Sequence, residues 1–173
     1  MKVIVTAYNP KWPQAFQEEA ELITQVLQKE IVTIHHIGST SVPGLHAKPI
    51  IDMIPVVKDI TRIDDYTNEM AAIGYEGLGE YGILGRRYFR KGGDHRTHQL
   101  HLFDENQVEA IERHVAVRDY LRMHPEEAVQ YGSLKKQLAA QFPNDIDAYI
   151  DGKDLFVKQL EQRALIWKQI VKG

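Results

Sequence analysis

The chain has 173 residues, of which 43% are hydrophobic and 26% are charged, a composition typical of one globular domain. The formal net charge of −3 gives no basic footprint for nucleic acid, and no apolar stretch reaches the roughly 18 residues of a membrane span. The absence of cysteine excludes disulfides, thiolate metal sites and cysteine nucleophiles, and with no signal-peptide pattern at the start it predicts a cytoplasmic protein.

Helix and strand patterns alternate along the first half of the chain. Apolar residues at spacings of three and four predict a helix over about 12–29, and a β-branched run predicts a strand over about 31–37. A second apolar run, residues 50–57, predicts a strand in the middle of a sheet, and Pro55 predicts that this strand ends or bulges nearby. A helix over about 60–73 is expected next.

The second half of the chain is predicted to contain a glycine-rich loop, a basic hairpin and then helices. Residues 76–85 are rich in glycine and predict a mobile loop, and the runs 86–91 and 96–103 predict a β-hairpin around a Gly-Gly-Asp turn. Three helices are predicted after that, over about 107–123, 126–141 and 145–170, the last capped by Asn144. The predicted fold class is α/β, or α+β, with a C-terminal helical segment, in one domain over residues 1–173.

A Gly-Ser turn follows the first predicted strand, where Gly38 and Ser39 are succeeded by the hydroxyl groups of Thr40 and Ser41. Glycine lets backbone amides approach a phosphate closely, and successive amides form an anion-binding concavity. Asp52 lies in the next, apolar strand, where a carboxylate needs a cation or a donor. Because Mg²⁺ binds few carboxylates and completes its shell with water and phosphate oxygens, Asp52 beside a triphosphate is chemically sensible. From residue types alone, an ordinary loop beside a hydrogen-bonded aspartate remains the alternative.

Histidines form two groups, His35 and His36 before this turn, and His95, His98 and His101 around the second hairpin strand. His36 shares a strand face with Gly38, and His101 lies on the second hairpin strand. If that strand is the neighbour of the strand that carries Asp52, His101 can serve as a metal ligand with Asp52 and His36, or as a general base. The alternative for His101 is a structural hydrogen bond.

The hairpin also carries a run of basic side chains, RRYFRKGGDHR. Arginine offers a bidentate fork to phosphate, which makes Arg87 a candidate phosphate ligand. Because Arg87 and Phe89 alternate with Arg86, Tyr88 and Arg90, only one of the two sets can face a site. The alternative is a solvated hairpin edge whose charges oppose edge-to-edge pairing.

The run HIGSTSVPGLHAKPIIDM resembles the signature of the GrpB family. The likeness continues through RRYFRK, QLHLF and RHVAVRDYLRMHPEEAVQYGSLKKQLA, and so covers nearly the whole chain. This family is similar to minimal nucleotidyltransferases, which implies a mixed β-sheet with helices. Their pattern is a Gly-Ser turn, an Asp-x-Asp/Glu pair on the next strand and a third carboxylate on a later strand. Gly38, Ser39 and Asp52 match it, whereas Ile54 stands where the second acid is expected, which puts two-metal chemistry in doubt.

The resemblance also implies residues that bind the nucleotide. In nucleotidyltransferase-like folds the helical part supplies lysines to the triphosphate and an aromatic residue to the base, which implies Lys135, Tyr149 and Lys153 here. Lys48, within the matching run, is a further candidate phosphate ligand. Each could equally be a surface charge or a tyrosine at the edge of the core.

Three functions follow from these observations. The first is an enzyme that binds a nucleoside triphosphate with Mg²⁺ or Mn²⁺ and transfers a nucleotidyl group to a small-molecule or protein acceptor, with Asp52 and His101 as catalytic residues. The second is a non-catalytic nucleotide-binding or sensing module, which Ile54 favours. The third is a metal-dependent enzyme on another substrate that uses Asp52, His36 and His101. The sequence contains no signal for an oligomeric state.

Overall fold

The computed structural model describes residues 2–172, which group into two compact units. Unit 1 contains the described chain up to Pro10, the segment Gly38–Pro49 and the chain from Glu112 onward. Unit 2 contains the segments Lys11–Ile37 and Ile50–Ile111. Both units are discontinuous in sequence, and the prediction of one domain over residues 1–173 stays a prediction.

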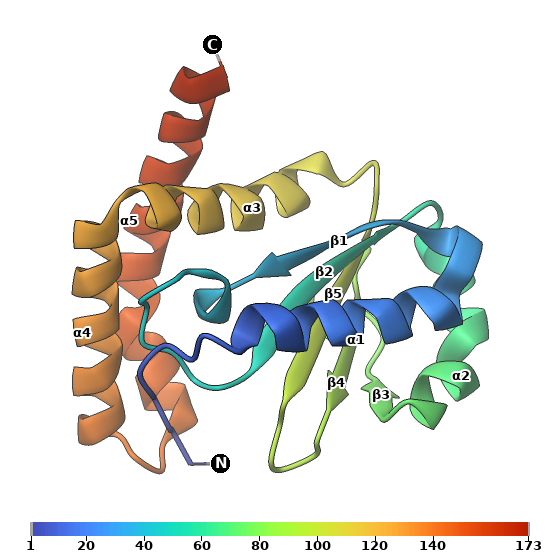
Figure 1. The fold of residues 1–173 in the computed structure, drawn as a ribbon, viewed down its shortest axis with the longest axis horizontal. Helices are drawn as coiled ribbons and strands as arrows, with labels where there is room; N and C mark the ends of the chain where they lie inside the picture. The colour runs from blue at the N-terminus through green and yellow to red at the C-terminus, as the bar shows by residue number, and fades with distance from the viewer. Residues whose placement is uncertain (1, 173) are drawn as a thin grey trace. The chain divides into compact units, whose positions relative to one another are not determined.

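Unit 2 is built on a five-stranded sheet with the strand order β1-β2-β5-β4-β3. The strands are β1 (Ile31–Ile37), β2 (Ile51–Val57), β3 (Tyr75–Gly77), β4 (Arg87–Lys91) and β5 (His98–Asp104). The pair β2/β5 is parallel and the other neighbouring pairs are antiparallel, so the sheet is mixed (Figure 1). The predicted hairpin is confirmed as β4/β5, and its second strand does lie beside the strand that carries Asp52.

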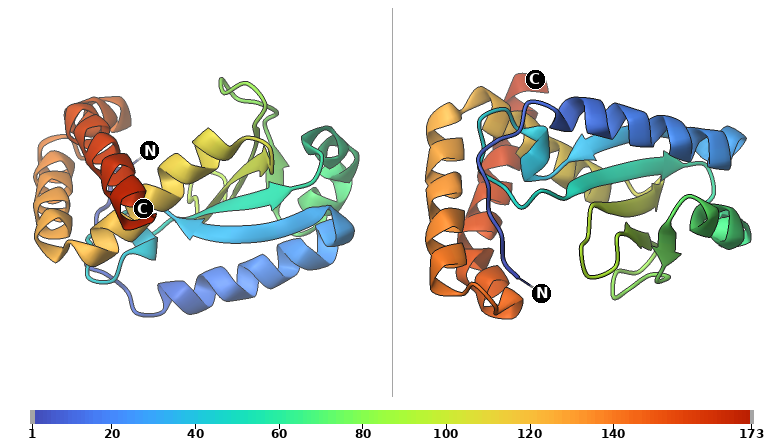
Figure 2. Two further views of the ribbon diagram at one scale, coloured as in Figure 1. Left: turned by 90° about the horizontal axis from the view of Figure 1, so that it is seen from above. Right: turned by 60° about the horizontal axis from the view of Figure 1, so that its bottom comes forward.

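Helix α1 (Trp12–Leu27) packs along this sheet through the apolar stripe that the sequence predicts (Figure 2). Only part of the helix predicted over 60–73 is an α-helix. A 3-10 helix, Ile60–Tyr66, comes first, and the short α-helix α2 (Thr67–Ala72) follows it. Asp59 caps that segment, because its side chain accepts a hydrogen bond of 3.0 Å from the backbone amide of Thr61. The glycine-rich run predicted as a loop contributes the short strand β3.

Pro55 does not end strand β2, contrary to one of the two outcomes predicted for it. The strand continues to Val57, and Pro55 is the register partner of Ile34 in β1. The pairing of the two strands is irregular at another place: the register shifts between Ile31 and Thr33 of β1, which lie opposite the end of β2. Ile54, its neighbour, is fully buried in an apolar cluster on the same face as Asp52.

Unit 1 is helical and consists of most of α3 (Val108–Met123), together with α4 (Pro125–Gln141) and α5 (Ile146–Lys172). Helices α4 and α5 run side by side (Figure 1 and Figure 2). Val42 and Leu45, from the segment inserted between β1 and β2, are fully buried in the core of these helices. The helical core therefore depends on residues far away in the sequence.

The last helix begins slightly later than predicted. Asp145, rather than Asn144, accepts a hydrogen bond from a first-turn amide, that of Ala148, at 3.1 Å. Within residues 2–172, no helix combines the length and the apolar character needed to cross a membrane.

Candidate functional site

The Gly-Ser turn of unit 1 is a short 3-10 turn, Ser39–Ser41, entered through Gly38. Gly38 has a φ of 71°, in the region that favours glycine, so the sequence needs this residue type here. The Ser41 hydroxyl donates to the Gly38 carbonyl and thereby closes the turn. Arg122 of α3 holds the turn from outside, because its Nε donates to the Ser41 carbonyl at 2.9 Å. The turn is thus rigidly held, with the Ser39 side chain left for other contacts.

Lys135 of α4 reaches that side chain. Its Nζ donates to the Ser39 Oγ at 2.6 Å and lies 4.5 Å from the centroid of the Tyr131 ring. Lys135 is only 1% exposed, and no carboxylate of the described chain pairs with it. Burial, followed by the charges of Lys153 and Lys48, lowers the pKa of Lys135 to about 6. A buried lysine among lysines is costly to the protein unless an anion joins it.

The ring of Tyr149 lies close to two other lysines, Lys48 and Lys153. The Nζ atoms of Lys48 and Lys153 lie 5.5 Å and 5.2 Å from the centroid of its ring. Tyr149 is fully buried, its hydroxyl lacks a hydrogen-bond partner among the described residues, and burial raises its pKa. We call Lys48, Lys135 and Lys153 the lysine site.

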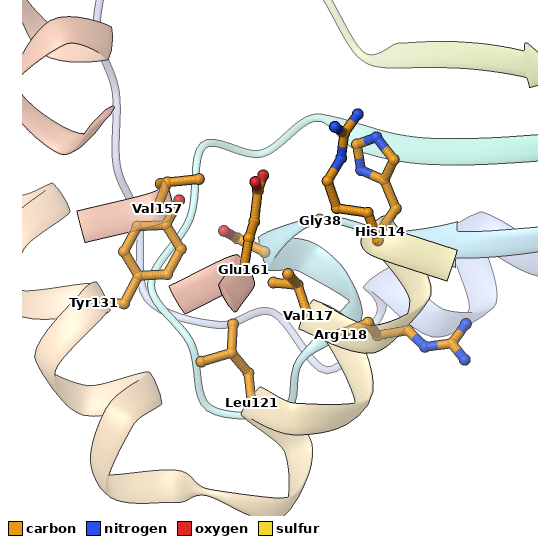
Figure 3. A pocket seen from close by; sticks show the side chains of 10 residues that line it. Gly38, His114, Val117, Arg118, Leu121, Tyr131, Val157 and Glu161 are labelled. Carbon is orange, nitrogen blue, oxygen red and sulfur yellow. The ribbon is translucent and has the colours of Figure 1, made fainter. Parts of the chain in front are cut away.

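A pocket of about 180 Å³ adjoins the lysine site within unit 1 (Figure 3). Ser39 and Tyr131 belong to both, since each lines the pocket and each contacts Lys135. The pocket is lined by backbone and side chains of the turn and of α3, α4 and α5: Gly38, Ser39, Arg113, His114, Val117, Arg118, Leu121, Tyr131, Val157 and Glu161. Its lining combines apolar side chains with several charged side chains.

In unit 2, Asp52 and His101 are neighbours as predicted. The His101 Nε2 and the Asp52 Oδ1 are 3.3 Å apart, and both side chains are partly exposed. The other ring nitrogen, Nδ1, lies 3.2 Å from Nη1 of Arg86. Because a guanidinium can only donate, Nδ1 accepts, which leaves the proton on Nε2 to be donated to Asp52. Both ring nitrogens of His101 therefore face protein groups.

Arg86 is buried, and it forms hydrogen bonds with other groups besides His101. Its Nε and Nη2 donate to the carbonyls of Glu80 and Tyr81, at 3.2 Å and 2.9 Å. Its guanidinium lies 5.1 Å from the centroid of the Tyr88 ring, and burial lowers its pKa. Arg86 thus joins the loop before β4 to His101.

A three-ligand metal centre is not assembled here. The described residues contain no group of three or more His, Cys, Asp or Glu side chains that could hold a metal ion. His36, one of the predicted ligands, stacks its ring on Phe16 of α1, with centroids 4.7 Å apart. Asp52 alone fits the one or two carboxylates that Mg²⁺ takes from a protein when phosphates supply the rest.

The other predicted phosphate ligands lie in different surroundings. Arg87 forms a two-point ion pair with Asp64, at 2.8 Å and 3.1 Å, within unit 2. Thr40 is buried, and the Ser41 hydroxyl is used inside the turn. Of the basic hairpin residues, the even-numbered set faces His101, so Arg86 is a residue that the sequence prediction missed. The alternation of the strand offered two sets and gave no reason to prefer this one.

The comparisons with known proteins agree with this description. The chain matches the family described as GrpB protein over residues 2–163. It is 51% identical to the UPF0157 protein YqkA of Bacillus subtilis over 97% of this chain, and it spans about half of that relative, 49%. The crystal structure of the conserved protein GrpB from Enterococcus faecalis has a TM-score of 0.94 at 47% identity, covering 96% of this chain and 99% of that one.

A more distant likeness concerns the fold alone. Cid1 poly(U) polymerase, in a structure with Mg 3′-dATP bound, has a TM-score of 0.54 at 14% identity, covering 78% of this chain and 43% of that one. The predicted fold class, a nucleotidyltransferase-like mixed sheet with helices, is therefore confirmed. With the family match over most of its length, the chain belongs to the GrpB family.

Proposed function

We propose that this chain binds a nucleoside triphosphate through phosphates at the lysine site and uses it to transfer a nucleotidyl group to a small-molecule or protein acceptor. The observation that carries the proposal is Lys135, a buried lysine that no carboxylate of residues 2–172 pairs with and whose electrostatic neighbours are Lys48 and Lys153. A polyphosphate supplies the negative charge that Lys135 lacks among the described residues, and Ser39 adds a hydroxyl. The fold shared with Cid1, a poly(U) polymerase, supports the reaction class.

In the proposed transfer, an acceptor hydroxyl attacks the α-phosphorus and the bond to the β-phosphate oxygen breaks, so that pyrophosphate leaves and the hydroxyl proton passes to a base. Asp52 is the candidate for a Mg²⁺ or Mn²⁺ ligand, and when bound the ion would neutralise phosphate charge. His101 donates to Asp52 and so fixes the orientation of that carboxylate.

A second candidate is a nucleotide-binding module without turnover. Ile54 favours it, because this side chain, at the position of the second acid, is fully buried in the apolar core. Metal binding at such a site would depend on Asp52 and the phosphates alone.

The first experiment is thermal unfolding in the presence of inorganic triphosphate and of ATP, GTP, CTP and UTP, with and without Mg²⁺. A ligand at about a hundred times its dissociation constant adds roughly 2.7 kcal/mol to the unfolding free energy. Lys135→Met should abolish the stabilisation, whereas Lys136→Met, an exposed change on the same helix, should preserve it. No stabilisation by any of these compounds would overturn the proposal.

The chemical step has its own measurement. Release of pyrophosphate from a bound triphosphate, lost in Asp52→Asn while binding of inorganic triphosphate is retained, would support transfer. Binding without release, with every acceptor class offered, would support the second candidate.

A further inference from the structure

Glu161 is an acidic side chain whose electrostatic neighbour on its own helix, Lys158, is already ion-paired with Asp154. It projects from α5 into the pocket, between Val157 on one side and Gly38 and His114 on the other (Figure 3). The side chain is partly buried, and it makes no hydrogen bond or ion pair with any residue in the described part of the chain. A carboxylate that has lost part of its water gains most from a ligand that offers N–H donors.

The surroundings of Glu161 suit one flat ring system. Val117, Leu121 and Val157 provide apolar walls, and Tyr131 adds a ring that is itself stacked on Phe156, with centroids 5.4 Å apart. The volume of about 180 Å³ is below the roughly 300 Å³ at which pockets begin to hold a whole drug-sized ligand. The pocket therefore takes a single group of a larger molecule.

That larger molecule would have its anionic end at the lysine site. Ser39 lines the pocket and also accepts the hydrogen bond of Lys135, and the Tyr131 ring lies under the same ammonium group. The two sites are thus contiguous through shared residues of unit 1. A base in the pocket and phosphates at the lysine site can belong to one nucleotide.

Resting on the proposed function, we infer that this pocket receives the nucleobase and that Glu161 selects guanine. The Watson–Crick edge of guanine presents two adjacent donors, the ring N1–H and the exocyclic N2 amine, which match the two oxygens of a carboxylate. Adenine and cytosine present an acceptor nitrogen beside their amine, and uracil flanks its one N–H with two carbonyl oxygens. Each of these places a lone pair against the Glu161 carboxylate, which is unfavourable.

The test is equilibrium binding of GTP, ITP, ATP and inorganic triphosphate to the full chain. ITP differs from GTP only in lacking the exocyclic amine, so it isolates the second hydrogen bond. GTP should bind more tightly than ITP and ATP by on the order of tenfold or more, the discrimination expected of a two-point contact. Glu161→Gln should remove that preference and leave inorganic triphosphate binding unchanged. Glu126→Gln, an exposed acid on α4, is the matched control and should behave as the wild type.

The outcomes separate this inference from the proposed function. Binding of inorganic triphosphate with equal affinity for GTP, ITP and ATP would overturn the guanine assignment and leave the lysine site standing. A preference for GTP that survives Glu161→Gln would also overturn it, since another group would then read the base. If neither inorganic triphosphate nor any nucleotide binds, both the guanine assignment and the proposed function are overturned.

Discussion

Lys135 is the one lysine of the described residues that is almost fully buried, and no carboxylate among those residues pairs with it. Its sequence context gave no sign of this, because lysines of a helix normally lie at the surface. The resemblance to a known family identified it as a candidate, and the structure shows why it is unusual. The low pKa of Lys135 is a consequence of burial and of Lys153 and Lys48.

Lys135 should make stability depend on pH in a defined direction. Its pKa is about 6 in the folded chain and near 10.4 in an unfolded one, so between these values the unfolded chain binds a proton that the folded chain lacks. The unfolding free energy therefore rises with pH in that window, by up to about 1.4 kcal/mol per pH unit from this group. Urea unfolding at pH 7, 8 and 9 should show a smaller rise in Lys135→Met than in the wild type and in Lys136→Met. Parallel pH profiles for all three proteins would show that Lys135 titrates normally.

Arg86 should fix the tautomer of His101. Arg86→Met removes the donor to Nδ1 and the two donors to loop carbonyls, and should lower the unfolding free energy by about 1–3 kcal/mol. It should also change the ¹⁵N chemical shifts of the His101 ring, which report which nitrogen carries the proton. Arg90→Met, which breaks a more exposed contact with Glu76, is the control. An unchanged His101 ring spectrum in Arg86→Met would show that Asp52 alone sets the tautomer.

The strands and helices were predicted well wherever their apolar pattern was regular. Strand β1 was predicted to its last residue, and the hairpin β4/β5 followed from the Gly-Gly-Asp turn between the runs 86–91 and 96–103. The pattern could not show that residues 60–66 form a 3-10 helix, because the two helix types share polar and apolar positions over so short a segment. Nor could it say whether Arg86 or Arg87 faces His101, since both parities of a strand are chemically plausible.

The turn of the β4/β5 hairpin depends on one of its two glycines much more than on the other. Gly92 has a φ of 101°, and a Cβ there would lie 2.4 Å from the backbone carbonyl oxygen of His95. Gly93 has a φ of 57° with no atom near its Cβ position. Gly92→Ala should lower the unfolding free energy by more than about 2 kcal/mol, and Gly93→Ala by about 1 kcal/mol. Equal melting temperatures of the two variants would contradict this turn geometry.

Each compact unit is assembled from separate stretches of chain. The helical core of unit 1 contains Val42 and Leu45, which precede the first of those helices, α3, by more than 60 residues. Neither this connectivity nor the division itself was predictable, because local patterns report the element that a segment forms and say little about its packing partners. The Asp52–His101 contact was an exception, since strand adjacency was the single condition on which it depended.

A fragment that begins at Glu112 should not fold independently. It keeps most of the helices of unit 1 but lacks Val42 and Leu45, which are about 1% exposed in the intact chain. Loss of two core side chains of this size typically costs several kcal/mol, comparable with the whole stability of a small domain. Circular dichroism should show a broad, non-cooperative thermal transition for the fragment. A sharp transition like that of the full chain would show that the helices need no help from the segment Gly38–Pro49.

The segment Gly38–Pro49 connects β1 to β2 and belongs to unit 1. It leaves β1 at the Gly-Ser turn, contributes Val42 and Leu45 to the helical core and returns to the start of β2 just before Asp52. A single inserted or deleted residue would displace Val42 or Leu45 from the helical core, so evolution should tolerate changes of side chain at the exposed positions here more readily than changes of length. Across the GrpB family, the number of residues between the Gly-Ser pair and this aspartate should therefore be invariant, while the loop before β4 varies.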